Sequence, residues 1–207
     1  MLQFITCSHA KLSPADQIRE AIKGGCRWVQ IDLPDASDDE IKKLVDEVKP
    51  LCEEKGVFLI MAHKVELAKE CNVGGVEVSK DDMPPSKARM ILGPAAVVGV
   101  KVNSLAEILA VSQLDIDYYT IAPFRGEDGE NETSLGIEGV RKICFEMEEK
   151  EVNIPHVAAG GIKLEDTLSL IEAGVNGLAV SEAIACADDP AAETEKFVAA
   201  LPKTEDE

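Results

Sequence analysis

The sequence lacks the features of a disulfide-stapled or membrane-spanning protein. It contains no C-x-x-C pair and no clustered histidines, and its cysteines are scattered: Cys7, Cys26, Cys52, Cys71, Cys144 and Cys186. The first residues, MLQFITCSHAK, lack the basic segment and apolar run of a secretory leader. No hydrophobic run approaches the roughly 20 residues that a membrane span requires. We therefore expect a cytoplasmic protein with reduced, buried thiols and no membrane partner.

Positive charge is also scarce. The 207 residues include 21 lysines and arginines against 39 acidic residues, which gives a formal net charge of −18. Because nucleic-acid binding depends on basic side chains that neutralise phosphates, we expect no nucleic-acid partner. A small phosphorylated ligand is compatible with this charge, since backbone N–H groups and a few local cations hold such ligands.

The sequence does contain a repeated alternation of short apolar runs and amphipathic stretches. Eight runs have the composition of buried strands: 2–7, 28–33, 57–62, 75–79, 96–102, 117–123, 156–161 and 177–182. Segments of helical periodicity separate them, and several end at a glycine that suits a helix C-cap. This alternation predicts a single α/β domain, a (β/α)₈ TIM barrel over residues 1–201, with an acidic tail at 202–207. An open doubly wound sheet is the alternative, but its G-x-G-x-x-G turn is missing.

Active sites of such barrels form at the C-terminal ends of the strands, which selects a short set of residues. Lys64, Lys80 and Lys101 occupy such positions in three successive units, although the chain is acidic. Lys101 lies within an apolar run and could act as a Schiff-base nucleophile or as a phosphate ligand. The structural alternative is an ion pair between Lys101 and Glu77 on the neighbouring strand.

A glycine pair predicts a phosphate site. Gly160 and Gly161 end the seventh run, where backbone N–H groups can approach an anion without interference from a Cβ atom. Together with Ser181, near the end of the eighth run, they occupy the common phosphate site of barrels. A plain tight turn is the alternative. Glu182 would repel a phosphate unless its side chain points outward.

Acidic and histidine side chains supply the remaining candidates. Asp82 follows the fourth run and could bind Mg²⁺ together with a substrate diphosphate, or Asp81 or Asp82 could cap the next helix. His63 directly follows the third run and could act as an acid or base, although a lone histidine is more often structural. The adjacent residues Cys-Ser-His at 7–9 do not make a catalytic triad, because neighbours in an extended segment do not share the required geometry.

Longer stretches carry a family resemblance. They are AIKGGCRWVQ, FLIMAHKVELAKE, VGGVEVSKDDMPPSKARMILG, VVGVKVNSLAEI, DIDYYTIAPF, IPHVAAGGI and EAGVNGLAVSEAIACADDP. In this order they resemble the thiamine phosphate synthases and the related thiazole tautomerases. The resemblance implies a transferase of thiamine biosynthesis that joins an aminopyrimidine diphosphate to a thiazole phosphate, with Mg²⁺ stabilising the departing pyrophosphate. It also implies that Gln30 contacts the pyrimidine, Asp82 the metal, and the glycine pair the thiazole phosphate.

Several family positions are changed in this chain. The family motif Gln-x-Arg-x-Lys reads Gln-Ile-Asp-Leu-Pro at 30–34, and the Asn-Asp pair after the third strand reads Ala-His at 62–63. A Thr-x-Thr-Lys loop falls near the acidic residues 127–130, and Asn103 stands where tautomerases have histidine. We therefore expect weak or substrate-dependent Mg²⁺ binding.

The predicted site can be divided by role. Lys101 and His63 are the catalytic candidates, Asp82 is the metal candidate, and Gly160, Gly161 and Ser181 are the phosphate-binding candidates. The substrate-binding candidates are Gln30, Lys64, Lys80, Asn103 and Arg125.

Three functions are open at this stage. One is a synthase-type transferase, and the second is a barrel enzyme that uses Lys101 on another phosphorylated carbonyl compound. The third is a non-catalytic relative that binds a phosphorylated ligand. A homodimer and a lid formed by residues 125–134 are also left open.

Overall fold

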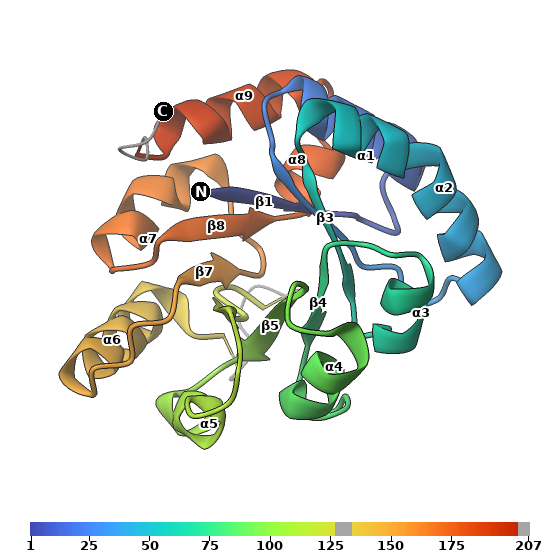
Figure 1. The fold of residues 1–207 in the computed structure, drawn as a ribbon. Coiled ribbons are helices and arrows are strands. Elements are labelled where there is room, and N and C mark those ends of the chain that lie inside the picture. The colour runs from blue at the N-terminus through green and yellow to red at the C-terminus, as the bar shows by residue number, and fades with distance from the viewer. Residues whose placement is uncertain (127–133, 203–207) are drawn as a thin grey trace.

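The protein forms a closed eight-stranded parallel barrel in a computed structural model that describes residues 1–126 and 134–202 (Figure 1). Each strand pairs with its neighbour in sequence, and β1 closes the barrel against β8. The strands are β1 (Leu2–Ile5), β2 (Trp28–Ile31), β3 (Phe58–Ala62), β4 (Gly75–Val78), β5 (Val97–Val102), β6 (Tyr118–Ile121), β7 (His156–Ala159) and β8 (Gly177–Val180). The predicted fold is confirmed.

Helices surround the barrel on the outside (Figure 1). They are α1 (Pro14–Lys23), α2 (Asp38–Lys55), α3 (Val65–Glu70), α4 (Pro85–Leu92), α5 (Leu105–Val111), α6 (Gly136–Glu149), α7 (Thr167–Glu172) after the 3₁₀ turn η1 (Leu164–Asp166), α8 (Glu182–Ala185) and α9 (Pro190–Ala200). Local sequence explains their ends. Ser37 and Glu40 form a capping box at the start of α2, and Gly56 ends that helix with a left-handed φ of 63°.

The eight predicted strand segments match the eight strands, but most predicted segments extend one or two residues further. The predicted segment 2–7, for example, becomes a strand only over Leu2–Ile5. In six of the eight runs the C-terminal residues belong to the loops that form the barrel mouth, whereas the runs 57–62 and 96–102 end with β3 and β5 and begin one residue early. The predicted acidic tail over 202–207 and the loop over 125–134, for which a lid was left open, fall largely on residues 203–207 and 127–133, which lie outside the described residues.

Two apolar cores hold the structure together. The larger one lies between the outer face of the sheet and the helices, where a side chain such as Phe4 is completely buried. The smaller one fills part of the lumen with Ala122, Val157, Ala159 and Ala179. Small side chains are required there because inward-facing residues of eight strands converge on one axis.

Within the described residues, no helix is both long and apolar enough to cross a membrane.

Candidate active site at the barrel mouth

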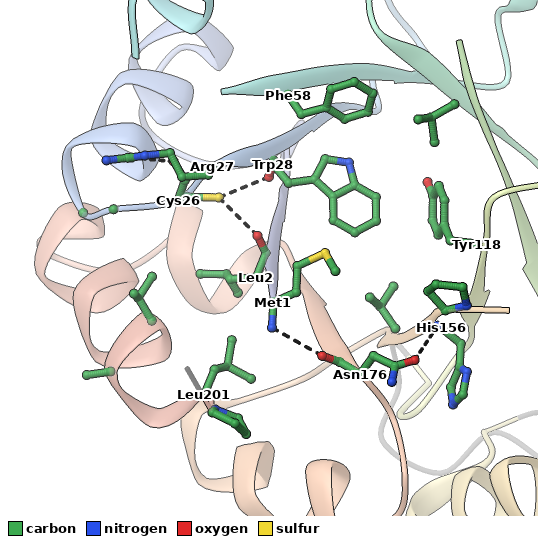
Figure 2. Close-up of a pocket in the computed structure, with 18 of the residues that line it drawn as sticks. Met1, Leu2, Cys26, Arg27, Trp28, Phe58, Tyr118, His156, Asn176 and Leu201 are labelled. Carbon is green, nitrogen blue, oxygen red and sulfur yellow. Dashed lines mark hydrogen bonds between the residues drawn. The ribbon is translucent and has the colours of Figure 1, made fainter. Parts of the chain in front are cut away.

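The two ends of the barrel differ. A pocket of about 710 Å³ lies at the N-terminal ends of the strands, and Figure 2 shows Trp28, Phe58 and Tyr118 around it. His156, the first residue of β7, also lines this pocket. Because barrel enzymes carry their active sites at the C-terminal ends of the strands, the candidate site is at the opposite end.

A buried polar layer crosses the barrel below the mouth. The Glu77 carboxylate accepts hydrogen bonds from Gln30 Nε2 (3.3 Å), Tyr118 OH (3.1 Å) and Thr120 Oγ1. Gln30 Oε1 in turn accepts from Gln3 Nε2 at 2.9 Å. Burial, and then the Glu77 charge, raise the pKa of Tyr118 well above its ordinary value, so its hydroxyl stays a donor at neutral pH. Gln30 is thus completely buried and held by side chains of the barrel.

Lys101 lies on the same inward-facing row of β5 as Gly99, two residues nearer the mouth. Its neighbour in the register is Thr120, and its side chain is exposed to solvent. Within residues 1–126 and 134–202, that side chain forms neither an ion pair nor a hydrogen bond. The alternative pairing with Glu77 is therefore wrong, because Glu77 is 5% exposed and fully engaged by three other donors. The Lys101 ammonium is free to meet a ligand that enters the mouth.

His63 and Asp82 form a pair at the ends of β3 and β4. His63 Nδ1 lies 2.6 Å from Asp82 Oδ2, and the same oxygen accepts from Ser79 N (2.7 Å) and Ser79 Oγ (2.9 Å). Burial tends to raise the pKa of Asp82, but the hydrogen bonds from His63 and Ser79 outweigh it and lower the pKa. The alternative in which Asp81 or Asp82 caps α4 is wrong, since Pro84 occupies the N-cap and no side-chain cap is formed.

The other candidate polar residues lie at varying distances from this centre. Lys80 Nζ is 3.8 Å from Glu107 Oε1, and Glu107 Oε2 accepts from the Asn103 backbone N–H at 2.8 Å. Glu107 on α5 therefore connects Lys80, which follows β4, with Asn103, which follows β5. Lys64 instead binds Asp38 Oδ1 at 2.7 Å, which directs its ammonium toward the start of α2.

Arg125 binds residues of the loop after β7. Its guanidinium makes two 3.0 Å hydrogen bonds to the two carboxylate oxygens of Asp166 and also donates to the Gly161 carbonyl. Gly160 and Gly161 have φ angles of 97° and 60°. A Cβ atom on Gly160 would lie 2.9 Å from Pro123, and one on Gly161 2.9 Å from Arg125 Cβ. Close packing of two loops therefore suffices to require both glycines, with or without an anion.

The sequence did not predict that Cys7, His9 and Cys186 come together where β1 and β8 end. Ser181 Oγ donates to the Thr6 carbonyl at 3.4 Å, and Glu182 turns outward to form an ion pair with His9 (2.8 Å). Cys7 and Cys186 lie beside this histidine. The expectation that all six thiols are buried is corrected, because Cys186 is exposed and Cys71 half-buried, although all six are free. The closure of the predicted barrel could have indicated this group, because it places the residues after the first strand beside those after the last strand.

Comparison with known proteins identifies the family. The family model described as thiamine monophosphate synthase matches residues 2–184. The chain belongs to the thiamine monophosphate synthase family. The thiamine-phosphate synthase of Bacteroides thetaiotaomicron is 39% identical over 199 residues, covering 95% of each chain. That of Bacteroides fragilis strain YCH46 is 40% identical over 199 residues, covering 95% of this chain and 98% of the relative. The solved thiamine phosphate pyrophosphorylase from Pyrococcus furiosus has a TM-score of 0.85 at 29% identity, covering 96% of this chain and 94% of the other.

In this member of the thiamine monophosphate synthase family, the structure brings together only part of the predicted site. His63, Asp82, Lys80, Lys101 and Asn103 gather at the ends of β3 to β5. The remaining candidates lie apart from that group or are engaged elsewhere. Gln30 lies below it, Lys64 is directed toward α2, Arg125 binds Asp166, and Gly160, Gly161 and Ser181 follow β7 and β8.

Proposed function

We propose that the protein is a transferase of the thiamine phosphate synthase type, which joins an aminopyrimidine diphosphate to a thiazole phosphate and releases pyrophosphate. The observation that carries the proposal is a free cation, Lys101, at the same end of the barrel as the ionised Asp82, in a chain of this family. A leaving diphosphate needs positive charge around it, and Lys101 offers that charge where the family's own cations are replaced. Lys80 adds to it when its ammonium turns from Glu107 Oε1, which lies 3.8 Å away.

Each residue then has a defined task. Lys101 and Lys80 bind diphosphate oxygens, for which charge-assisted hydrogen bonds are well suited. Gln30 lies below them, where its amide would form part of the floor under the pyrimidine. Backbone N–H groups around Gly160, Gly161 and Ser181 would receive the phosphate of the thiazole, and Asn103 is placed to contact either substrate. His63, held by Asp82, is the candidate acid or base of the mouth.

The direct test is incubation of the purified protein with aminopyrimidine diphosphate, thiazole phosphate and Mg²⁺, with mass spectrometry for thiamine phosphate and an assay for released pyrophosphate. Both products are expected in equal amounts. If each substrate binds but no product forms, the protein is a non-catalytic ligand-binding relative.

Magnesium fits this mouth only in part. Mg²⁺ bound beside the diphosphate would neutralise the charge of the leaving group. Asp82 is the residue that would hold it, through Oδ1, because Oδ2 already accepts from His63 and Ser79. Among the described residues, no group of three carboxylate, histidine or cysteine ligands includes Asp82.

We therefore expect Mg²⁺ to bind only together with a substrate diphosphate, since Mg²⁺ dehydrates reluctantly and needs more than one anionic ligand. Titration calorimetry of the free protein should give no saturable heat below the millimolar range, and addition of aminopyrimidine diphosphate should tighten the binding. Tight binding of Mg²⁺ to the free protein would contradict this.

Lys101→Met is expected to weaken binding of the diphosphate substrate by roughly 1.5–3 kcal/mol, the range for hydrogen bonds to charged groups, or about 10- to 150-fold. Lys64→Met is the matched control, because Lys64 is already paired with Asp38 and should change affinity little. Calorimetric titration of both variants measures the difference.

The same variant distinguishes the transferase from the second candidate function, a barrel enzyme that uses Lys101 on a phosphorylated carbonyl compound. A Schiff-base lysine is activated by a desolvating pocket, whereas the Lys101 side chain is exposed. Borohydride treatment with a phosphorylated aldehyde should therefore trap no adduct. A covalent adduct that Lys101→Met abolishes would favour the enzyme of phosphorylated carbonyl compounds instead.

A further inference from the structure

Three side chains capable of binding a metal meet where β1 and β8 leave the barrel. The ligand atoms of Cys7, His9 and Cys186 all lie within 4.8 Å of one another. Cys7 and His9 follow β1, whereas Cys186 is the C-cap of α8, so the barrel closure brings them together. No role in the proposed transfer uses them.

The three ligand atoms lie within reach of one zinc ion. Zn–S bonds of about 2.3 Å and Zn–N bonds of about 2.05 Å at tetrahedral angles separate sulfur from nitrogen by about 3.6 Å, and two thiolates on one zinc ion are about 3.8 Å apart. The three atoms here lie within 4.8 Å of one another, so they need to approach by up to about 1 Å. Cys7 Sγ lies 3.5 Å from both His9 Nδ1 and His9 Nε2, which places the sulfur over the face of the imidazole, so the ring must turn about its Cβ–Cγ bond to direct Nδ1 at the metal. A disulfide would require the sulfurs to approach to about 2.05 Å.

Glu182 supplies an independent feature. Its Oε1 lies 2.8 Å from His9 Nε2. In metal sites, a ligating histidine nearly always donates its second ring N–H to a carboxylate or carbonyl, which fixes the tautomer and the ring orientation. Glu182 holds Nε2 in this way, which leaves Nδ1 on the side of the ring available to a metal.

We propose that Cys7, His9 Nδ1 and Cys186 bind a zinc-class divalent metal ion, with Glu182 as the residue that positions His9. Three protein ligands leave the fourth tetrahedral position open, as in catalytic rather than structural zinc sites. The His9 and Glu182 side chains are 63% and 62% exposed, so water or an anionic oxygen can reach that position. This site is chemically distinct from the oxygen-ligand site of Asp82 and stands independently of the transferase proposal.

The test uses the full chain, freed of metal, kept reduced with a phosphine and titrated anaerobically with CoCl₂. We expect a thiolate-to-cobalt charge-transfer absorption that saturates at one equivalent and disappears when ZnCl₂ is added. Glu182→Gln should keep the absorption but weaken affinity by about 10- to 100-fold, the usual effect of losing such an orienting group. Cys186→Ser should weaken it further and reduce the charge-transfer intensity. Cys186 is exposed, so this variant should fold normally.

Cys71→Ser is the matched control, because Cys71 is half-buried at the end of α3 and outside the cluster. It should bind cobalt as the unaltered protein does. Absence of a saturable thiolate band, or an identical band in Cys186→Ser, would overturn the proposal. The proposal would also be overturned if the reduced protein bound no cobalt and air oxidation formed a Cys7–Cys186 disulfide. The two thiols would then be a redox pair.

Discussion

Glu77→Leu is expected to lower the free energy of unfolding by about 3–5 kcal/mol, because it leaves the donors of Gln30, Tyr118 and Thr120 without an acceptor inside the barrel. Each unsatisfied buried donor costs about 1–3 kcal/mol, and leucine fills the volume without replacing any of the three hydrogen bonds. For a chain of this size, each kcal/mol moves the melting temperature by about 2–4 °C, so a decrease on the order of 10 °C should follow. Thermal unfolding followed by circular dichroism measures it.

Two further variants show that the effect comes from the polar layer. Glu77→Gln keeps one acceptor oxygen and should be less destabilising than Glu77→Leu. Glu66→Leu makes the same chemical change at an exposed position of α3 and should stay within about 0.5 kcal/mol of the parent. A Glu77→Leu protein as stable as the parent would mean that burial of the Glu77 charge costs as much free energy as its hydrogen bonds supply.

The barrel could be predicted from the sequence because its signals are local and repeated. Runs such as 57–62 and 96–102 are short, β-branched and separated by helical periodicity, and eight such units have one closed parallel arrangement. The ends of the strands could not be predicted as well. A residue such as Thr6 continues the run of β1 in the sequence, but in the structure it lies past the end of the strand, where its N–H donates to the Gln30 carbonyl and its hydroxyl to the Asp32 carbonyl in the next loop.

The positions of the candidate side chains were predictable, but their partners were not. Strand order places Lys101 and Asp82 at one end of the barrel. That Lys64 turns to Asp38 and Arg125 to Asp166 depends on acids 26 residues before and 41 residues after them in the chain. In a chain with 39 acidic residues, many such pairings are available, and only the three-dimensional arrangement selects among them.

Cys7 and Cys186 show the same limit more clearly. The separation of 179 residues between them follows no motif spacing, so the sequence predicted isolated thiols. Their proximity results from the pairing of β1 with β8, where Phe4 lies opposite Val180 in the register. A rule that compares the residues after the first strand with those after the last strand of a closed barrel would have found them.

Asp82→Asn is expected to lower kcat/KM of the proposed transfer by about 10²–10³, the usual cost of removing one preorganised electrostatic group from an active site. The substitution removes the charge that faces His63 at 2.6 Å and the oxygen available to Mg²⁺. Asp81→Asn, an exposed neighbour with the same change of charge, is the matched control and should leave the rate nearly unchanged.

The pH dependence of stability gives a readout of Asp82 that does not depend on activity. Its pKa in the folded protein lies below the ordinary 3.8, so its contribution to stability is present above that value and disappears as the pH falls through the lower folded pKa. Without added Mg²⁺, the melting temperature of Asp82→Asn should therefore be below that of the parent at neutral pH, and the difference should shrink below about pH 4. A difference that stays constant to acid pH would show that the ionised carboxylate does not hold His63 and Ser79 in place.

A double-mutant cycle tests whether His63 and Asp82 act as one unit. If they do, adding His63→Ala to Asp82→Asn should lower kcat/KM by a smaller factor than His63→Ala lowers it in the parent. Fully additive losses would separate the two residues.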